Sequence, residues 1–248
     1  MDLKGRLVFI AGGGYFGSIA VKSLKEVKAR VVVADVNENC RAGKYVDKAI
    51  STPTLVSPSD GEAYLVVYDC VNYLIEMFRG GVMPDIIVPA VPGNFIGRFF
   101  KSYLESKGFN VNPDFSSISM VLRSNVLSNV ILDVNTESCV VVVSYMLKGF
   151  KCRTPCIQPE TCPVTGRTKK IPMYLLLEQA IDNISYPKIF QSHLINPNIG
   201  GIQGELISAF LDEAISSYRP KIAVGAACKC HGIVNFFKIS RQTNNNFK

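Results

Sequence analysis

The sequence lacks any long uninterrupted hydrophobic run, although 48% of its 248 residues are hydrophobic. The longest apolar stretch, residues 139–146, is far shorter than the roughly 18–20 residues that a membrane-spanning helix needs. The first six residues lead directly into an apolar segment, which leaves no room for a signal peptide. We therefore expect a globular protein of the cytoplasm that has no membrane partner.

The eight cysteines lack the paired Cys-x-x-Cys spacing of a zinc ribbon and the tighter spacing of radical-SAM enzymes. Histidine is also scarce, because the chain contains only His193 and His231. No Ser/His/Asp arrangement and no paired-carboxylate motif stands out, which argues against chemistry that depends on such groups. The sequence shows no internal repeat.

Positive charge is concentrated in one window. Of the formal net charge of +7, +5 falls between Lys148 and Lys170, where six basic residues accompany one acid, Glu160. A nucleic-acid-binding protein usually spreads positive charge along a face and interleaves aromatic residues, so nucleic acid is not the expected partner. The charge could instead offset thiolates, attract a small anionic substrate or an acidic redox partner, or simply be solvated.

Apolar runs and helical patterns alternate through the first part of the chain. Strands are predicted at residues 7–11, 31–35, 46–50 and 85–89, and helices at 15–28, 62–79 and 95–106. This alternation is typical of a Rossmann-like, doubly wound parallel sheet, so we predict an α/β fold.

The pattern changes near residue 109. A hairpin is predicted from two segments, 129–134 and 139–145, joined by a polar turn. Helices are then predicted at 173–183 and 200–217, and strands at 188–195, 221–225 and 234–239. We predict two domains, a dinucleotide-binding domain at 1–108 and a mixed α/β domain with a cysteine-rich loop at 109–248.

A glycine-rich fingerprint, Gly-x-Gly-x-x-Gly, runs from Gly12 through Gly14 to Gly17 and includes Tyr15 and Phe16. It follows a predicted strand and opens a predicted helix, and this context makes it far more specific than the pattern alone. Such glycines permit a tight turn, a close approach of backbone to pyrophosphate and close helix–strand packing. The other interpretation is a glycine turn that binds no nucleotide.

An acidic residue, Asp35, ends the second predicted strand eighteen residues after Gly17. Its carboxylate is expected to accept hydrogen bonds from the adenosine ribose and to repel a 2′-phosphate, which favours NAD over NADP. Arg41 lies too far along the chain to overturn that preference.

The N-terminal part resembles the Rossmann domains of saccharopine-dehydrogenase-like proteins and of potassium-uptake regulators. The matching residues are 7–17, 31–35 and 85–89 with the following loop, Ala90 to Asn94. The resemblance covers residues 5–105 and implies a nucleotide site. It also implies that Ala90 and Val91 lie beside the nicotinamide.

Three cysteines lie within eleven residues, in a segment where Pro155, Pro159 and Pro163 disfavour a helix and favour an extended loop. Thiols spaced in this way in a reducing compartment more often hold a metal than a disulfide. We predict Zn²⁺ or a [4Fe–4S] cluster, with a redox-active thiol pair or unliganded thiols as the alternatives. The predicted ligands are Cys152, Cys156 and Cys162 with Cys228 or Cys230, and His231 is a further candidate.

A second glycine-rich segment joins the strand predicted at 188–195 to the helix predicted from Gly200. Free amides at that helix start could hold an anion, and His193 is a candidate acid or base. The alternative is a flexible turn beside a hydrogen-bonded histidine.

These features suggest two functions. The first is an NAD-dependent oxidoreductase whose second domain carries a metal or iron–sulfur site near the nicotinamide. The second is a non-enzymatic NAD-binding sensor or assembly factor, in which thiols report redox state or metal supply. The substrate and the oligomeric state do not follow from the sequence.

Overall fold

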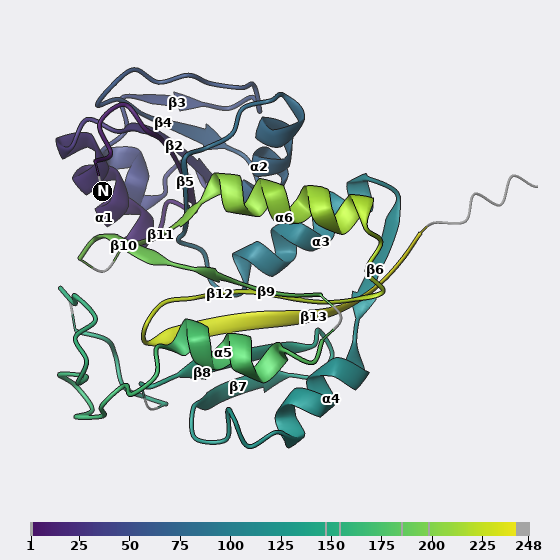
Figure 1. Ribbon diagram of the computed structural model, residues 1–248. Helices are drawn as coiled ribbons and strands as arrows, with labels where there is room; N and C mark the ends of the chain where they lie inside the picture. Colours follow the sequence, from purple (N-terminus) through teal and green to yellow (C-terminus); the bar gives the residue numbers. More distant parts are fainter. Residues whose placement is uncertain (1, 147, 154, 185, 198, 242–248) are drawn as a thin grey trace, which may run out of the picture. The chain divides into compact units, whose positions relative to one another are not determined.

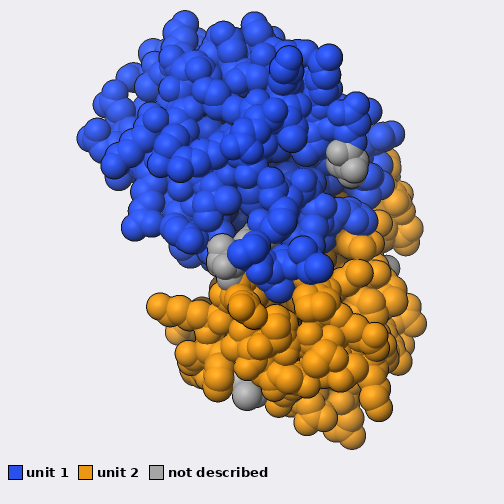
Figure 2. Space-filling view, turned by 90° about the vertical axis from the view of Figure 1, so that its left-hand side faces the viewer, with its two compact units in different colours: residues 1–95, 154–157, 192–209 blue, residues 96–153, 158–191, 210–248 orange. Residues whose placement is uncertain are grey.

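The computed structural model describes residues 2–146, 148–153, 155–184, 186–197 and 199–241, and it is an α/β structure as predicted (Figure 1). Two compact units are distinguished in Figure 2, and both are assembled from separate stretches of chain. Unit 1 comprises residues 1–95, 154–157 and 192–209, and unit 2 comprises residues 96–153, 158–191 and 210–248. The units are therefore interleaved, whereas the sequence-based division has a single boundary at residue 108. No described helix has the length and apolarity needed to cross a membrane.

Unit 1 is built on a seven-stranded sheet of order β10-β11-β5-β1-β2-β4-β3. The five strands from β5 to β3 are parallel, β11 is antiparallel to β5, and β10 is antiparallel to β11. The strands are β1 (Leu7–Ala11), β2 (Arg30–Asp35), β3 (Lys48–Ile50), β4 (Ala63–Val67), β5 (Ile86–Pro89), β10 (His193–Asn196) and β11 (Ile199–Gln203).

The central strand β1 is buried on both faces, which explains its uninterrupted apolar sequence. Val8 and Ile10 belong to a core with α1 (Tyr15–Glu26), while Phe9 lies 6.4 Å, between ring centroids, from Tyr73 on α2 (Cys70–Arg79). A 3₁₀ helix (Arg41–Lys44) packs beside α1.

The prediction of a helix at residues 62–79 is wrong for the first half of this range. Residues 63–67 form β4, in which Leu65 and Val66 pair with β2, and the helix α2 begins at Cys70. The helix starts there because the Asp69 carboxylate accepts hydrogen bonds from the amides of Val71 and Asn72, which caps the N-terminus.

Unit 2 is built on a second sheet, of order β7-β8-β13-β12-β9, and β6 also pairs with β13. The long strand β13 is antiparallel to β12, β8 and β6, and β12 is parallel to β9. The strands are β6 (Phe109–Pro113), β7 (Ile131–Asn135), β8 (Val140–Ser144), β9 (Tyr186–Gln191), β12 (Lys221–Ala227) and β13 (His231–Arg241).

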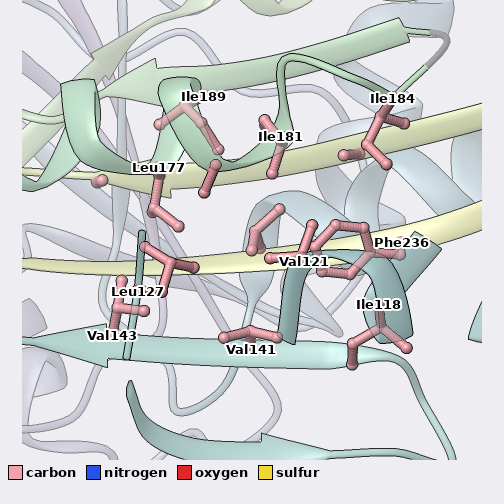
Figure 3. Packing of buried hydrophobic residues seen from close by; sticks show 14 of the residues in the cluster. Ile118, Val121, Leu127, Val141, Val143, Leu177, Ile181, Ile184, Ile189 and Phe236 are labelled. Atoms are coloured by element: carbon pink, nitrogen blue, oxygen red, sulfur yellow. The ribbon is translucent and has the colours of Figure 1, made fainter. Parts of the chain in front are cut away.

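Four further helices are α3 (Phe95–Ser106), α4 (Phe115–Arg123), α5 (Met173–Ile181) and α6 (Gly204–Ser216), and unit boundaries fall inside α3 and α6. Side chains from α4, α5 and the sheet converge in the core shown in Figure 3, among them Val121, Leu177 and Phe236. A separate aromatic group includes Tyr186, which stacks on Phe210 at 4.7 Å between ring centroids. The predicted hairpin is confirmed as β7–β8, whereas β6 and α4 were not predicted.

Two predictions around the second glycine-rich segment are wrong. The strand predicted at 188–195 is divided between β9 and β10, which belong to different sheets, and the helix predicted from Gly200 begins at Gly204. Gly201 lies in β11, where a Cβ atom would stand 2.5 Å from Cγ2 of Ile86. Glycine therefore lets β11 lie close to β5, and it does not open a helix.

Candidate functional site

The glycine loop between β1 and α1 has the geometry that its sequence predicts. Gly12 adopts a positive φ of 98°, and a Cβ atom on Gly17 would lie 2.0 Å from the carbonyl oxygen of Gly12. A Cβ atom on Gly14, the N-cap of α1, would meet no atom of the described residues within 4 Å beyond its immediate neighbours. The turn is therefore tight on its inner side and open at Gly14.

The carboxylate of Asp35 is tied to this loop. Its Oδ2 accepts a hydrogen bond of 2.7 Å from the amide of Gly13, and its Oδ1 accepts one of 2.8 Å from the amide of Asn37. An ionised carboxylate offers about four acceptor positions, so both oxygens can still accept from a ribose hydroxyl.

The loop after β5 lies against the glycine loop. The amide of Ala90 donates to the carbonyl of Ala11 at 2.9 Å, and a Cβ atom on Gly12 would stand 2.5 Å from Cγ1 of Val91. The structure thus brings the predicted residues Gly12, Ala90 and Val91 together at the carboxyl edge of the parallel strands. In open α/β sheets, ligands bind at such edges.

A neighbour of this loop that the sequence did not indicate is Cys40. A Cβ atom on Gly13 would lie 2.3 Å from Cys40 Sγ, so the middle glycine is required by packing. Burial raises the pKa of the Cys40 thiol, and the nearby Asp35 charge raises it further. The sequence signal was the glycine at position 13, between the two glycines of the fingerprint. That glycine indicates close packing, but it does not identify Cys40 as the residue that packs there.

The outer surface of the loop is aromatic and basic. Tyr15 and Phe16 are 50% and 53% exposed, and their rings meet edge to face at 5.3 Å between centroids. The guanidinium carbon of Arg41 lies 5.6 Å from the Tyr15 ring centroid. Arg41 is therefore close to the N-terminus of α1 in space, despite its distance along the chain.

The candidate acid or base His193 is the first residue of β10, opposite Gly201 of β11. Because β10 is the edge strand, β11 separates it from β5 and from the glycine loop beyond. The catalytic role of His193 stays a prediction.

In unit 2, the turn that joins β12 to β13 gathers two thiols and an imidazole. The potential ligand atoms of Cys228, Cys230 and His231 all lie within 4.8 Å of one another, and Cys228 Sγ is 3.8 Å from His231 Nδ1. The amide of Cys228 donates to the carbonyl of His231 at 2.9 Å, which closes the turn.

The environment of Cys228 favours a thiolate. A hydrogen bond from the Cys230 side chain is the largest cause that lowers the pKa of Cys228 to about 4, and His231 adds to the effect against the opposing cost of burial. The amides of Cys230 and His231 also point at the Cys228 sulfur, at 3.3 and 3.4 Å. Such a thiolate is suited to bind a soft metal ion.

The three loop cysteines are not members of this group. Cys152 is exposed and lines a cavity of about 390 Å³ that His231 also lines, and Cys162 is buried. Cys156 lies in the short stretch 154–157, which belongs to unit 1. Of the five predicted ligands, Cys228 and Cys230 therefore lie next to each other and to His231. The assignment of Cys156 and Cys162 as ligands stays a prediction.

Cys162 has a distinct environment, in a small turn closed by a hydrogen bond from its amide to the Arg167 carbonyl. Burial would raise the pKa of its thiol, but hydrogen bonds from the Thr165 hydroxyl and from the amides of Thr165 and Val164 outweigh burial and lower it. The charge of Lys169 lowers the pKa of Cys162 further, so hydrogen bonds of the turn and a nearby cation together favour the thiolate form.

The chain is 27% identical over 231 residues to an "Uncharacterized protein" of Archaeoglobus fulgidus, and the alignment covers 92% of this chain and 98% of that protein. No solved structure gives a significant match. The model of the AF_1314_C family, described as "Uncharacterized protein, C-terminal domain", matches residues 99–240. Since this segment is more than half of the chain, the protein belongs to the AF_1314_C family.

Proposed function

We propose that the protein is an NAD-dependent oxidoreductase of the cytoplasm whose unit 1 binds the dinucleotide. The observation that carries this proposal is the convergence of three loops at one edge of the parallel sheet. Gly12 contacts the loop after β5, and Asp35 at the end of β2 holds the amide of Gly13. Backbone amides at the start of α1 would face the pyrophosphate, and Asp35 would accept from the ribose. NAD supplies hydride transfer when bound.

The thiolate group in unit 2 is the proposed second redox or metal element, with Zn²⁺ or an iron–sulfur cluster as its cofactor. Lys148 lines the same cavity as Cys152 and His231. Asp133 lines the cavity as well, so the support for an anionic substrate or an acidic redox partner is the net charge of +5 between Lys148 and Lys170 and not the cavity lining alone.

The test is equilibrium binding of NAD⁺ and NADH, followed by anaerobic turnover of NADH with a panel of electron acceptors. Gly14→Asp is the informative variant, since its side chain would enter open space and aspartate is a good N-cap residue. We expect this variant to fold and to lose dinucleotide binding by charge repulsion with the pyrophosphate. Ser59→Asp is the matched control, because Ser59 is exposed and precedes β4 at the opposite edge of the sheet.

Three outcomes are distinguishable. Binding and turnover that are both lost in Gly14→Asp and kept in Ser59→Asp support the oxidoreductase. Tight NAD binding without turnover on any acceptor replaces it with the NAD-binding sensor or assembly factor. Failure of the wild-type protein to bind any dinucleotide overturns both proposals.

A further inference from the structure

The β12–β13 turn holds a donor set whose spacing is close to that of a tetrahedral metal site. With Zn–S of about 2.3 Å and Zn–N of about 2.0 Å, tetrahedral angles place sulfur and nitrogen roughly 3.5 Å apart. Cys228 Sγ and His231 Nδ1 are 3.8 Å apart, and Cys230 Sγ is within 4.8 Å of both. Cys228 Sγ and His231 Nδ1 are therefore within a few tenths of an ångström of the required spacing, whereas the sulfur of Cys230 would have to move by up to about 1 Å to reach a tetrahedral position.

The backbone that presents these donors is fixed by its neighbours. The amide of Met173 donates to the Lys229 carbonyl at 3.1 Å, and the amide of Tyr145 donates to the Cys230 carbonyl at 3.0 Å. The Lys229 amide donates to Oε1 of Gln158, also at 3.1 Å. A turn held from three directions is preorganised, so little backbone entropy would be lost when an ion binds.

Two backbone amides hydrogen-bond to the Cys228 sulfur and would support it as a metal ligand. N–H groups that donate to a metal-bound thiolate offset its negative charge and fix its orientation. The Cys228 sulfur already accepts two such hydrogen bonds, from the backbone amides of Cys230 and His231.

A fourth donor is available across the cavity that His231 lines. Among the described residues that line this cavity of about 390 Å³, Cys152 is the one that carries a thiol. It is exposed and belongs to a segment without regular structure, and it lines the same cavity as His231. Asp133 also lines the cavity, but sulfur donors are preferred over carboxylates by soft metal ions.

We propose that Cys228, Cys230 and His231 bind one Zn²⁺ ion and that Cys152 completes its tetrahedral coordination. This ligand set differs from the set predicted from the sequence, because Cys228 and Cys230 both bind, His231 changes from a further candidate to a ligand, and Cys156 and Cys162 leave. A site with four protein ligands and no open position is structural, and it would join the turn to the loop that carries Cys152.

The test uses the full-length protein, freed of metal under anaerobic conditions and titrated with Co²⁺ as a spectroscopic substitute for Zn²⁺. Tetrahedral Co²⁺ shows intense ligand-field bands, and its thiolate charge-transfer absorption grows with the number of bound sulfurs. We expect one ion per chain in the wild-type protein. Cys228→Ser and His231→Gln should each weaken Co²⁺ binding by more than the roughly 10–100-fold that is lost when a residue supporting a metal ligand is removed, because each variant removes a ligand itself. Cys152→Ser should keep the ion but lose about one third of the charge-transfer intensity, since one of three thiolates is removed.

Cys162→Ser is the matched control, because it removes a buried thiol of unit 2 that this ligand set does not use. Circular dichroism of each metal-free variant separates loss of a ligand from loss of the fold. The proposal is overturned if Cys162→Ser weakens Co²⁺ binding as much as Cys228→Ser does. It is also overturned if the anaerobically isolated protein contains iron with acid-labile sulfide in place of zinc. Dinucleotide binding is measured separately with Gly14→Asp, so either proposal can fail alone.

Discussion

The amide of Gly13 donates a 2.7 Å hydrogen bond to the carboxylate of Asp35. One side chain therefore connects the end of β2 to the glycine loop after β1. In the proposed complex with NAD the same carboxylate would also accept hydrogen bonds from the ribose, so the shape of the loop and the recognition of the nucleotide would depend on one group.

Replacement of this carboxylate should separate the two roles. We expect Asp35→Ala to weaken NAD binding by about 1.5–3 kcal/mol, the usual range for a hydrogen bond to a charged group. Asp35→Asn keeps an acceptor oxygen but removes the negative charge, so it should lose less NAD affinity and raise the affinity for NADP relative to NAD. Dissociation constants for both nucleotides, measured for wild type and both variants, check this expectation. An unchanged preference in Asp35→Asn would contradict the assigned role of the charge.

The contact between Gly13 and Cys40 predicts an energetic coupling. Gly13→Ala would place a Cβ atom 2.3 Å from Cys40 Sγ, and overpacking of this kind costs about 1–3 kcal/mol of stability. The same substitution should cost less in a Cys40→Ala background, because the sulfur is gone. Chemical denaturation of the four proteins of this cycle measures the coupling. Strict additivity of the two substitutions would show that these residues are not in contact.

Asp114, the N-cap of α4, predicts a pH dependence of stability in unit 2. Burial alone would raise the pKa of this carboxyl group, but hydrogen bonds from the Ser116 and Ser117 hydroxyls outweigh it and hold the pKa below the ordinary value. A folded-state pKa lower than the unfolded one contributes stability that is complete above about pH 4 and is lost as the pH falls further. Asp114→Ala should therefore cost about 1–2 kcal/mol near neutral pH and progressively less in acid.

This contribution is measured from the unfolding free energies of the wild type and Asp114→Ala over a pH series. Asp60→Asn, which changes an exposed carboxylate, is the control. A difference between wild type and Asp114→Ala that persisted unchanged at about pH 2 would rule out the charged cap as its source.

Gly201→Ala discriminates between the strand in the structure and the helix predicted from the sequence. In an exposed helix this substitution would stabilise the protein by about 1 kcal/mol. In β11 the added methyl group would meet Ile86 at 2.5 Å, so we expect a loss of about 1–3 kcal/mol. Thermal or urea unfolding of the two proteins decides the sign, and a stabilised variant would refute the pairing of β11 with β5.

The parts of the fold that could be predicted from sequence depend on short-range signals. The run from Leu7 to Gly17 contains a buried strand, a glycine turn and a helix start in direct succession, and each of these is local. The turn at Cys228 is similar, since its three donors lie within four residues of chain. In contrast, Leu65 and Val66 form part of an apolar run that suits a strand or a buried helix equally, and only their pairing with β2 decides between them.

Long-range relationships could not be predicted in this way. Nothing local to Cys40 indicates that it packs on Gly13, and nothing local to Cys152 indicates that it shares a cavity with His231. Gly200 and Gly201 suggested a loop and a helix start because glycine is common there, whereas both lie in β11. A Cβ atom on Gly201 would meet Ile86 of β5, more than one hundred residues earlier in the sequence, and a Cβ atom on Gly200 would meet the hydroxyl of Ser192.

The interleaving of the two units bears on how such a chain can be inherited. The family segment, residues 99–240, contains β10 and β11, yet the strand that β11 pairs with, β5, lies outside it. A gene fragment for that segment alone would encode two strands without their hydrogen-bonding partner, and it would leave the edge of β5 bare in any protein that kept the remainder. Exchange of that segment alone would therefore break a strand pairing on which both pieces depend. The alignment with the archaeal relative, over 92% of this chain and 98% of that protein, extends through both units.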